Sequence, residues 1–123
     1  MDNVKNDDYY VSKICHDLEY IMRHMDGTDA DAFSGNELLQ DSMMFRLIQI
    51  SENARKLTDD YRGRHSVIPW MAMFGLRNRI VHDYGNVVLD VVFETLKNDI
   101  PELMKAMKAE LADSFPAEPG KRH

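Results

Sequence analysis

The sequence predicts an all-α fold, an antiparallel bundle of four to five helices. Apolar residues recur at the i, i+3, i+4 spacing of an amphipathic helix along most of the 123 residues. No segment alternates apolar and polar residues as a half-buried strand does, and no Asn-Gly or Asp-Gly pair joins two apolar runs. Glycine and proline fall between the periodic segments, where they are typical of turns. A chain of this length forms one domain, which we expect to cover residues 1–112.

The first two helices are predicted over residues 7–25 and 36–61. Each carries an apolar stripe that can face a common core. The segment 25–35 between them is acidic and contains glycine, so it is expected to be a loop. Either Ser34 or Asn36 is expected to cap the second helix. The two stripes consist of Val11, Ile14, Cys15, Leu18, Ile21, Met22 and Met25 in the first helix, and Leu39, Met43, Leu47, Ile50, Ala54 and Leu57 in the second.

The third and fourth helices are predicted over residues 69–84 and 86–112. Pro69 suits the first turn of the third helix, where an N–H group would have no partner. Gly85 is expected to end that helix in a left-handed conformation. Pro101 should break or kink the last helix, because proline lacks a backbone donor and its ring clashes with the preceding turn.

The composition is that of a soluble globular domain, with 44% hydrophobic and 29% charged residues. No apolar run approaches the ~20 residues that cross a bilayer, and residues 1–8 lack the basic and apolar regions of a signal peptide. The single cysteine, Cys15, excludes an intrachain disulfide and suits a reducing compartment. We therefore expect a cytoplasmic protein. Residues 113–123 are polar, contain two prolines and are expected to form a disordered tail.

The charge distribution favours a local contact with an anionic ligand. A net charge of −6 opposes general coating of nucleic acid. Residues 61–82, however, contain no Asp or Glu and carry +4, so the remainder carries −10. Such a basic strip favours a local RNA contact, or a basic or nucleotide-bearing partner, although solvated arginines on a surface remain an alternative. The basic residues of the strip are Arg62, Arg64, Arg77 and Arg79, with His65 and His82.

The segment from Arg77 to Tyr84 combines residue types that RNA cleavage requires. Arginine holds a phosphate with a planar fork of donors, and histidine transfers protons near neutral pH. At about 100° per residue, Asn78 and His82 are neighbours on the helix, and Arg77 and Tyr84 lie one above the other. Arg79 points to the other side. The alternative is a structural role at the helix end, where cations are favourable.

One helix places Arg77 and His82 too far apart to grip the same phosphate. A second copy of the helix, related by a two-fold axis, would supply the missing half. The third helix is apolar nearly all round, which implies burial on two sides and is consistent with a dimer interface. A metal is not expected, because no His-x3-His or His-Glu-x2-His spacing is present. The remaining histidines are interpreted as surface or satisfied side chains: His16, His24 and His65.

Several segments together resemble one known family. The motif Arg77-x4-His82-x-Tyr84, with Asn78 after the arginine, resembles the motif of the HepT-like ribonuclease toxin family, which belongs to the HEPN superfamily. The resemblance covers about residues 7 to 110, and at Val88 many members carry an acidic residue instead. Its other motifs are Ile68-Pro69-Trp70, the run from Phe45 to Ala54 with Ser51-Glu52-Asn53 in place of the commoner Gly-Glu-Ala, and the break at Asp99-Ile100-Pro101-Glu102-Leu103.

The resemblance implies a metal-independent endoribonuclease toxin of a two-gene toxin–antitoxin system. The implied partner is a minimal nucleotidyltransferase antitoxin that attaches AMP to the motif tyrosine. Carried over residue by residue, Arg77 and His82 are catalytic and Tyr84 is the modified residue. Asn78 is inferred to orient the histidine or the phosphate. No cofactor is implied. The chain is expected to form a homodimer, either alone or as part of a larger hetero-oligomer. It is not expected to bind a membrane.

Two other functions remain compatible with the sequence. The chain could be a non-catalytic helical module that binds and regulates a nucleotidyltransferase. It could also be a nucleotide-binding or substrate-presenting subunit that uses the same surface. Cleavage of RNA by the unmodified protein would separate the toxin from both.

Overall fold

The structure is a computed structural model that describes the backbone of residues 6–114 and the side chains of residues 6–109. It confirms the all-α fold, because the described residues form helices and turns without a strand. Within residues 6–114, nine elements follow one another: α1 (Asp7–Met25), α2 (Ala30–Ser34), α3 (Glu37–Arg55), α4 (Asp59–Arg64), α5 (Trp70–His82), the short 3₁₀ turn η1 (Tyr84–Asn86), α6 (Leu89–Glu94), the π-helical turn η2 (Thr95–Asp99) and α7 (Ile100–Ser114).

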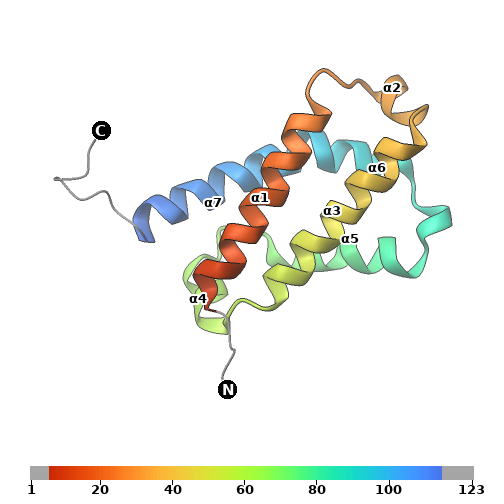
Figure 1. Ribbon diagram of the computed structural model, residues 1–123. Helices are drawn as coiled ribbons and strands as arrows, with labels where there is room; N and C mark the ends of the chain where they lie inside the picture. Colours follow the sequence, from red (N-terminus) through yellow and green to blue (C-terminus); the bar gives the residue numbers. More distant parts are fainter. Residues whose placement is uncertain (1–5, 115–123) are drawn as a thin grey trace.

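Four long helices make the body of the bundle. α1 and α3 run antiparallel side by side, α5 packs against α3, and α7 packs against α1 (Figure 1). The short α2 contacts α3 and α6, and η2 contacts α1. In the described part of the chain, no helix is both long enough and apolar enough to cross a membrane.

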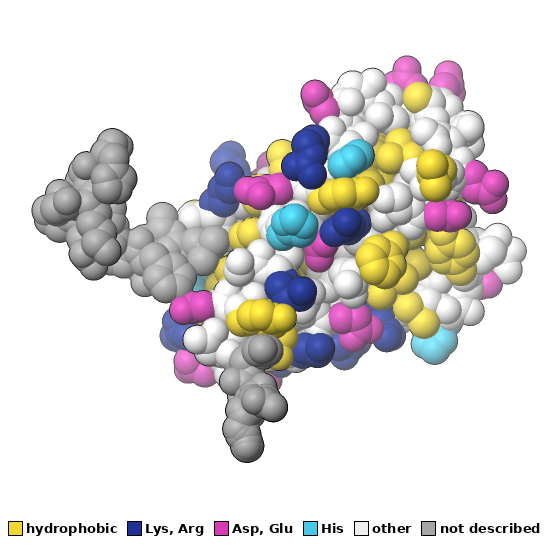
Figure 2. Space-filling model, viewed as in Figure 1, with side chains coloured by type: hydrophobic (Ala, Val, Ile, Leu, Met, Phe, Trp, Pro, Cys, Tyr) yellow, Lys and Arg dark blue, Asp and Glu magenta, His cyan; other side chains and the backbone are white. Residues whose placement is uncertain are grey.

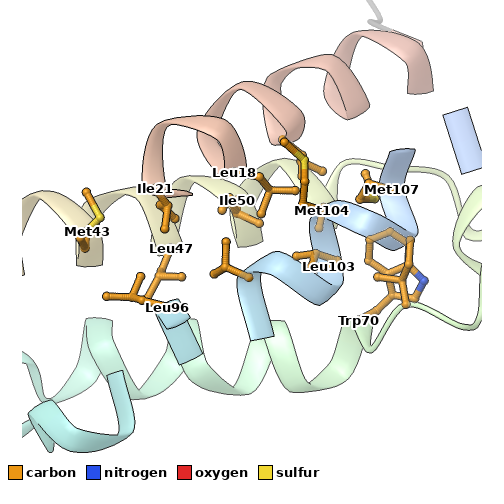
Figure 3. Close-up of a cluster of buried hydrophobic side chains, with 14 of the residues drawn as sticks. Leu18, Ile21, Met43, Leu47, Ile50, Trp70, Leu96, Leu103, Met104 and Met107 are labelled. Atoms are coloured by element: carbon orange, nitrogen blue, oxygen red, sulfur yellow. The ribbon is translucent and has the colours of Figure 1, made fainter. Parts of the chain in front are cut away.

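The core lies where the stripes of α1 and α3 meet α5 and the C-terminal segment (Figure 3). Both predicted stripes are confirmed in outline, although Met22 is 38% exposed. Burying one such aliphatic side chain contributes about 1.5–3 kcal/mol. The labelled core side chains are Leu18 and Ile21 from α1, Met43, Leu47 and Ile50 from α3, Trp70 from α5, and Leu96, Leu103, Met104 and Met107 from η2 and α7.

Side-chain caps start four of the helices. Asn36 accepts a hydrogen bond from the backbone N of Leu39 at 3.0 Å, so it is the cap of α3 and Ser34 is not. The same arrangement, which satisfies an otherwise unpaired N–H at a helix start, occurs three further times. The other caps are Asn6 for α1, Asp29 for α2 and Thr58 for α4.

Two predicted boundaries were wrong because of distant contacts. The expected loop 25–35 contains α2, which forms because Phe33 is buried against Phe93, with ring centroids 5.8 Å apart. The expected helix 36–61 ends at Arg55, and a new helix starts after Thr58. There the N and Oγ1 of Thr58 donate to the carboxylate of Asp7, 51 residues earlier in the sequence.

The end of the third predicted helix also differs. α5 begins directly after Pro69, as expected, but ends at His82 instead of Tyr84. Gly85 does not adopt the predicted left-handed conformation, since Gly27, with φ 75°, is the one described residue with positive φ. Instead Asp83 leaves the helix with φ −146°, and Asn86 donates to its side chain at 2.8 Å.

The predicted break near Pro101 is confirmed, and it takes the form of a widened turn. The helix expected from residue 86 begins at Leu89, without a side-chain cap. It then passes through the π-helical turn η2 into α7, where Pro101 occupies the first turn and needs no N–H partner. α7 extends to Ser114, two residues beyond the predicted end. The rest of the predicted tail lies outside the described residues.

Candidate functional site

Two arginines of the predicted basic strip are paired with acidic residues. In α4, Arg62 contacts Asp59 at 2.6 Å and Arg64 contacts Asp60 at 2.9 Å. Asp59 and Asp60 lie just before residues 61–82, the segment without Asp or Glu. They therefore pair with two of the four arginines that give this segment its charge of +4. On the face shown in Figure 2, basic side chains and histidines gather over α1, and acidic side chains lie around α2.

Arg77 is held on α5 by an acidic residue of α3. Its Nε donates to Oε2 of Glu52 at 2.8 Å, and its Nη2 lies 2.5 Å from the same oxygen. Its Nη1 donates to Oδ1 of Asn78 at 3.1 Å. The side chains of Arg77 and Glu52 are 25% and 36% exposed. Charge-assisted contacts of this kind fix the guanidinium plane while the remaining donors stay available at the surface.

His82 is exposed on the last turn of the same helix. Because α5 is continuous from Trp70 to His82, Arg77 and His82 stand about 140° apart round its axis. Asn78 lies between them and is exposed. One copy of α5 therefore presents both residue types without directing them at one point.

Tyr84 lies outside the helix, so the predicted stacking of Arg77 and Tyr84 was wrong. Its side chain reaches α3 instead, where its hydroxyl donates to Oδ1 of Asp41. Burial raises the pKa of the Tyr84 hydroxyl to about 12, together with the hydrogen bond to Asp41 and the negative charges of Asp41 and Glu37. The residue is still 45% exposed, so the phenol is accessible from outside.

The two acidic partners on α3 are the site residues that the sequence did not assign. Asp41 and Glu52 are eleven positions apart, which is close to three helical turns, so both lie on the face that meets α5. This spacing is visible in the sequence. Its meaning becomes clear only once α3 and α5 are known to pack together.

The other histidines of residues 6–109 lie in separate local environments. His24 contacts the backbone oxygen of Tyr20 at 2.9 Å and stacks on its ring. His65 is buried beside Tyr61, with ring centroids 4.2 Å apart, and is therefore not a surface residue. Among the described residues, no three His, Cys, Asp or Glu side chains gather as metal ligands.

An apolar groove of about 290 Å³ lies between α5 and the C-terminal segment. Leu76, Arg77 and Leu103 are among the residues that line it. His82 and Tyr84 are not among its lining residues. The groove therefore meets the Arg77–Tyr84 segment at Arg77 and does not extend to the other two motif residues.

Comparison with known proteins places these residues in a family context. The family model described as Ribonuclease HepT-like matches residues 14–110. A provisionally assigned RNase of Caldanaerobacter subterraneus subsp. tengcongensis is 28% identical over 80% of this chain and 88% of its own length. A probable ribonuclease HepT of Thermococcus cleftensis is 28% identical over 76% of this chain and 86% of its own length. No solved structure matches the chain.

Proposed function

Since this chain belongs to the HepT-like ribonuclease family, we propose that it is the metal-independent endoribonuclease toxin of a toxin–antitoxin pair. Arg77 and His82 carry out the cleavage, and Asn78 orients the histidine or the phosphate. AMP attached to Tyr84 by a partner nucleotidyltransferase silences the enzyme. The observation that supports this most directly is that one continuous helix, α5, carries both Arg77 and an exposed His82.

RNA supplies its own nucleophile, the 2′-hydroxyl. One imidazole takes the proton of this hydroxyl as its oxygen attacks phosphorus, and a protonated imidazole gives a proton to the leaving 5′-oxygen. His82 has the residue type and the exposure for either step. Arg77 compensates the negative charge that accumulates on the non-bridging oxygens in the transition state. No metal-bound water takes part in this scheme.

The active unit in this proposal is a homodimer. Arg77 and His82 diverge round one helix, so a second α5 is needed to bring an arginine and a histidine to the same phosphate. Apolar side chains that a single chain leaves exposed on α5 support this arrangement, since Met71 is 78% exposed and Val81 is 44% exposed. The expected burial of this helix on two sides is thus not met within one chain.

Silencing follows from the position of Tyr84 two residues after His82. An AMP group on its hydroxyl adds a phosphate charge and a base at the end of α5 that carries His82. The added negative charge would repel the RNA backbone from this end of the helix.

Cleavage by the purified, unmodified protein in EDTA tests the proposal. Arg77→Ala and His82→Ala are expected to lower the cleavage rate at least ~100-fold, because each removes a group that acts in the transition state. Arg79→Ala is the matched control, since it removes an arginine from the same helix on another side. Equal cleavage by wild type and both site variants would refute the proposal.

One observation favours the alternative of a non-catalytic regulatory module. Glu52 occupies two donors of Arg77, which leaves less of the guanidinium for a phosphate. That alternative expects a tight complex with the nucleotidyltransferase and no RNA cleavage by the unmodified chain.

A further inference from the structure

Asp41 contacts the one atom of Tyr84 that modification would change. The hydroxyl of Tyr84 donates to Oδ1 of Asp41, across 43 positions of sequence and between η1 and α3. Asp41 is exposed and Tyr84 is 45% exposed, so a second molecule can approach the hydroxyl while this hydrogen bond is in place.

We propose that Asp41 is the catalytic base for AMP transfer to Tyr84, so that the acceptor protein supplies this group instead of the nucleotidyltransferase. This inference rests on the proposed modification of Tyr84. It adds to that proposal a residue of α3 that orients the hydroxyl and removes its proton.

The reaction balances with one co-reactant, a nucleoside triphosphate held by the partner enzyme. The phenolic oxygen of Tyr84 attacks the α-phosphorus and forms a new P–O bond. The bond from that phosphorus to the β-phosphate oxygen breaks, and pyrophosphate leaves. The proton of the hydroxyl passes to the carboxylate of Asp41 and then to solvent. A carboxylate that accepts a hydroxyl proton during phosphoryl transfer has a parallel in the catalytic aspartate of protein kinases.

Other nearby groups fit this role less well. Asp83 is adjacent in sequence, but its Oδ1 accepts a hydrogen bond from Asn86 at 2.8 Å. Glu37 lies one turn before Asp41 on α3, and its charge acts on Tyr84. The hydrogen bond from the Tyr84 hydroxyl, however, goes to Asp41.

The hydrogen bond also explains why a base is needed. Burial and the carboxylates raise the pKa of Tyr84 to about 12, so the free phenolate is scarce at neutral pH. The oxygen must therefore lose its proton during the attack and not before it. A carboxylate already hydrogen-bonded to that proton allows this, and it orients an oxygen lone pair towards the incoming phosphorus.

The test measures AMP transfer to the full-length protein by the proposed partner nucleotidyltransferase, with ATP and Mg²⁺, by intact mass. At saturating nucleotidyltransferase, Asp41→Asn is expected to lower the transfer rate at least ~30-fold, because the amide keeps an oxygen for the hydrogen bond but accepts no proton. Glu37→Gln is the matched control, since it removes a neighbouring negative charge from the same helix. It should stay within ~3-fold of wild type.

A second measurement separates chemistry from a damaged surface. In a titration of ¹³C-tyrosine by NMR, Asp41→Asn should lower the pKa of Tyr84 towards 10.0, and Glu37→Gln should lower it less. Transfer by Asp41→Asn at the wild-type rate would overturn the inference. So would an unchanged pKa of Tyr84 in that variant.

The outcomes distinguish this inference from the proposal beneath it. If wild type is modified at Tyr84 and Asp41→Asn is modified equally fast, the proposed role of Asp41 is refuted and the silencing mechanism is not. Absence of any AMP on wild-type Tyr84 removes the silencing mechanism and this inference together. RNA cleavage by the wild type is measured separately and depends on neither result.

Discussion

Replacing Glu52 with alanine should damage RNA cleavage far more than it damages the fold. The change removes both contacts that Oε2 of Glu52 makes with Nε and Nη2 of Arg77, at 2.8 Å and 2.5 Å. Because the two side chains are 25% and 36% exposed, solvent screening limits the pair to about 1 kcal/mol of stability. For a domain of this size that corresponds to a melting temperature lower by roughly 3–5 °C.

The cleavage rate depends on where the guanidinium points. Without Glu52, Arg77 keeps its contact with Asn78 but loses the two that fix its plane. A displacement of about 1 Å in a catalytic group can cost up to ~100-fold in rate, so we expect kcat to fall between ~10-fold and ~100-fold. Affinity for RNA should not fall, because the change removes a negative charge from the site.

The assay follows cleavage of a fluorescent RNA in EDTA, with thermal unfolding measured on the same samples. Asp60→Ala is the matched control, since it breaks an ion pair with Arg64 in α4, where both side chains are more than half exposed. A rate within ~2-fold of wild type for Glu52→Ala would refute the positioning role. A faster rate would mean that the ion pair restrains Arg77 in the resting protein.

Three further properties can be measured on the isolated chain. The pKa of Tyr84 is raised to about 12 from an ordinary 10.0, so the folded state binds the hydroxyl proton more tightly than the unfolded state does. The stability that this tighter proton binding contributes is fully present below pH 10 and is lost as the pH rises to about 12. Tyr84→Phe should therefore lose less stability than wild type over that range in guanidinium unfolding, and parallel curves would contradict this. Within the described part of the chain the buried Ser51 hydroxyl has no hydrogen-bond partner. Ser51→Ala should therefore be as stable as wild type or up to ~1 kcal/mol more stable. A clear loss of stability in this variant would contradict that reading of the hydroxyl. Burial and the charge of Glu19 raise the pKa of the Cys15 thiol, so this thiol should react with a disulfide reagent at pH 8 more slowly than free cysteine, and an equal rate would disprove the shielding.

Local signals in the sequence predicted the parts of the fold that depend on local interactions. The first helix was placed correctly over residues 7–25, because its apolar stripe begins after a capping residue and ends before Gly27. The break near Pro101 was also predicted, since the cost of proline inside a helix does not depend on distant contacts. Asn36 was one of two capping candidates, and only its hydrogen bond from the backbone N of Leu39 in the structure distinguished it from Ser34.

The errors occur where distant segments meet. The contact of Thr58 with Asp7 interrupts a segment that is periodic enough to continue as a helix. Tyr84, which its spacing placed on the third helix, lies beyond the end of that helix and contacts Asp41 of α3. Local periodicity carries no information about either contact.

The residues of the candidate site also fall into two groups, those that the sequence identifies and those that only the packing of the helices identifies. Arg77 and His82 stand out in the sequence because their residue types suit phosphate chemistry. Glu52 and Asp41 do not, because an acidic residue on a long helix is ordinary until its partner helix is known. The structure therefore adds to the site the groups that hold its arginine and its tyrosine.

A heterodimer of two inactive variants tests the central claim, that Arg77 and His82 act together across a two-fold interface. One protomer carries Arg77→Ala and the other carries His82→Ala, each with a different affinity tag so that the mixed species can be purified. Of the two composite sites, one then lacks both groups and the other keeps both, so the heterodimer should cleave RNA at about half the wild-type rate. A heterodimer no more active than either mutant homodimer would contradict the composite site.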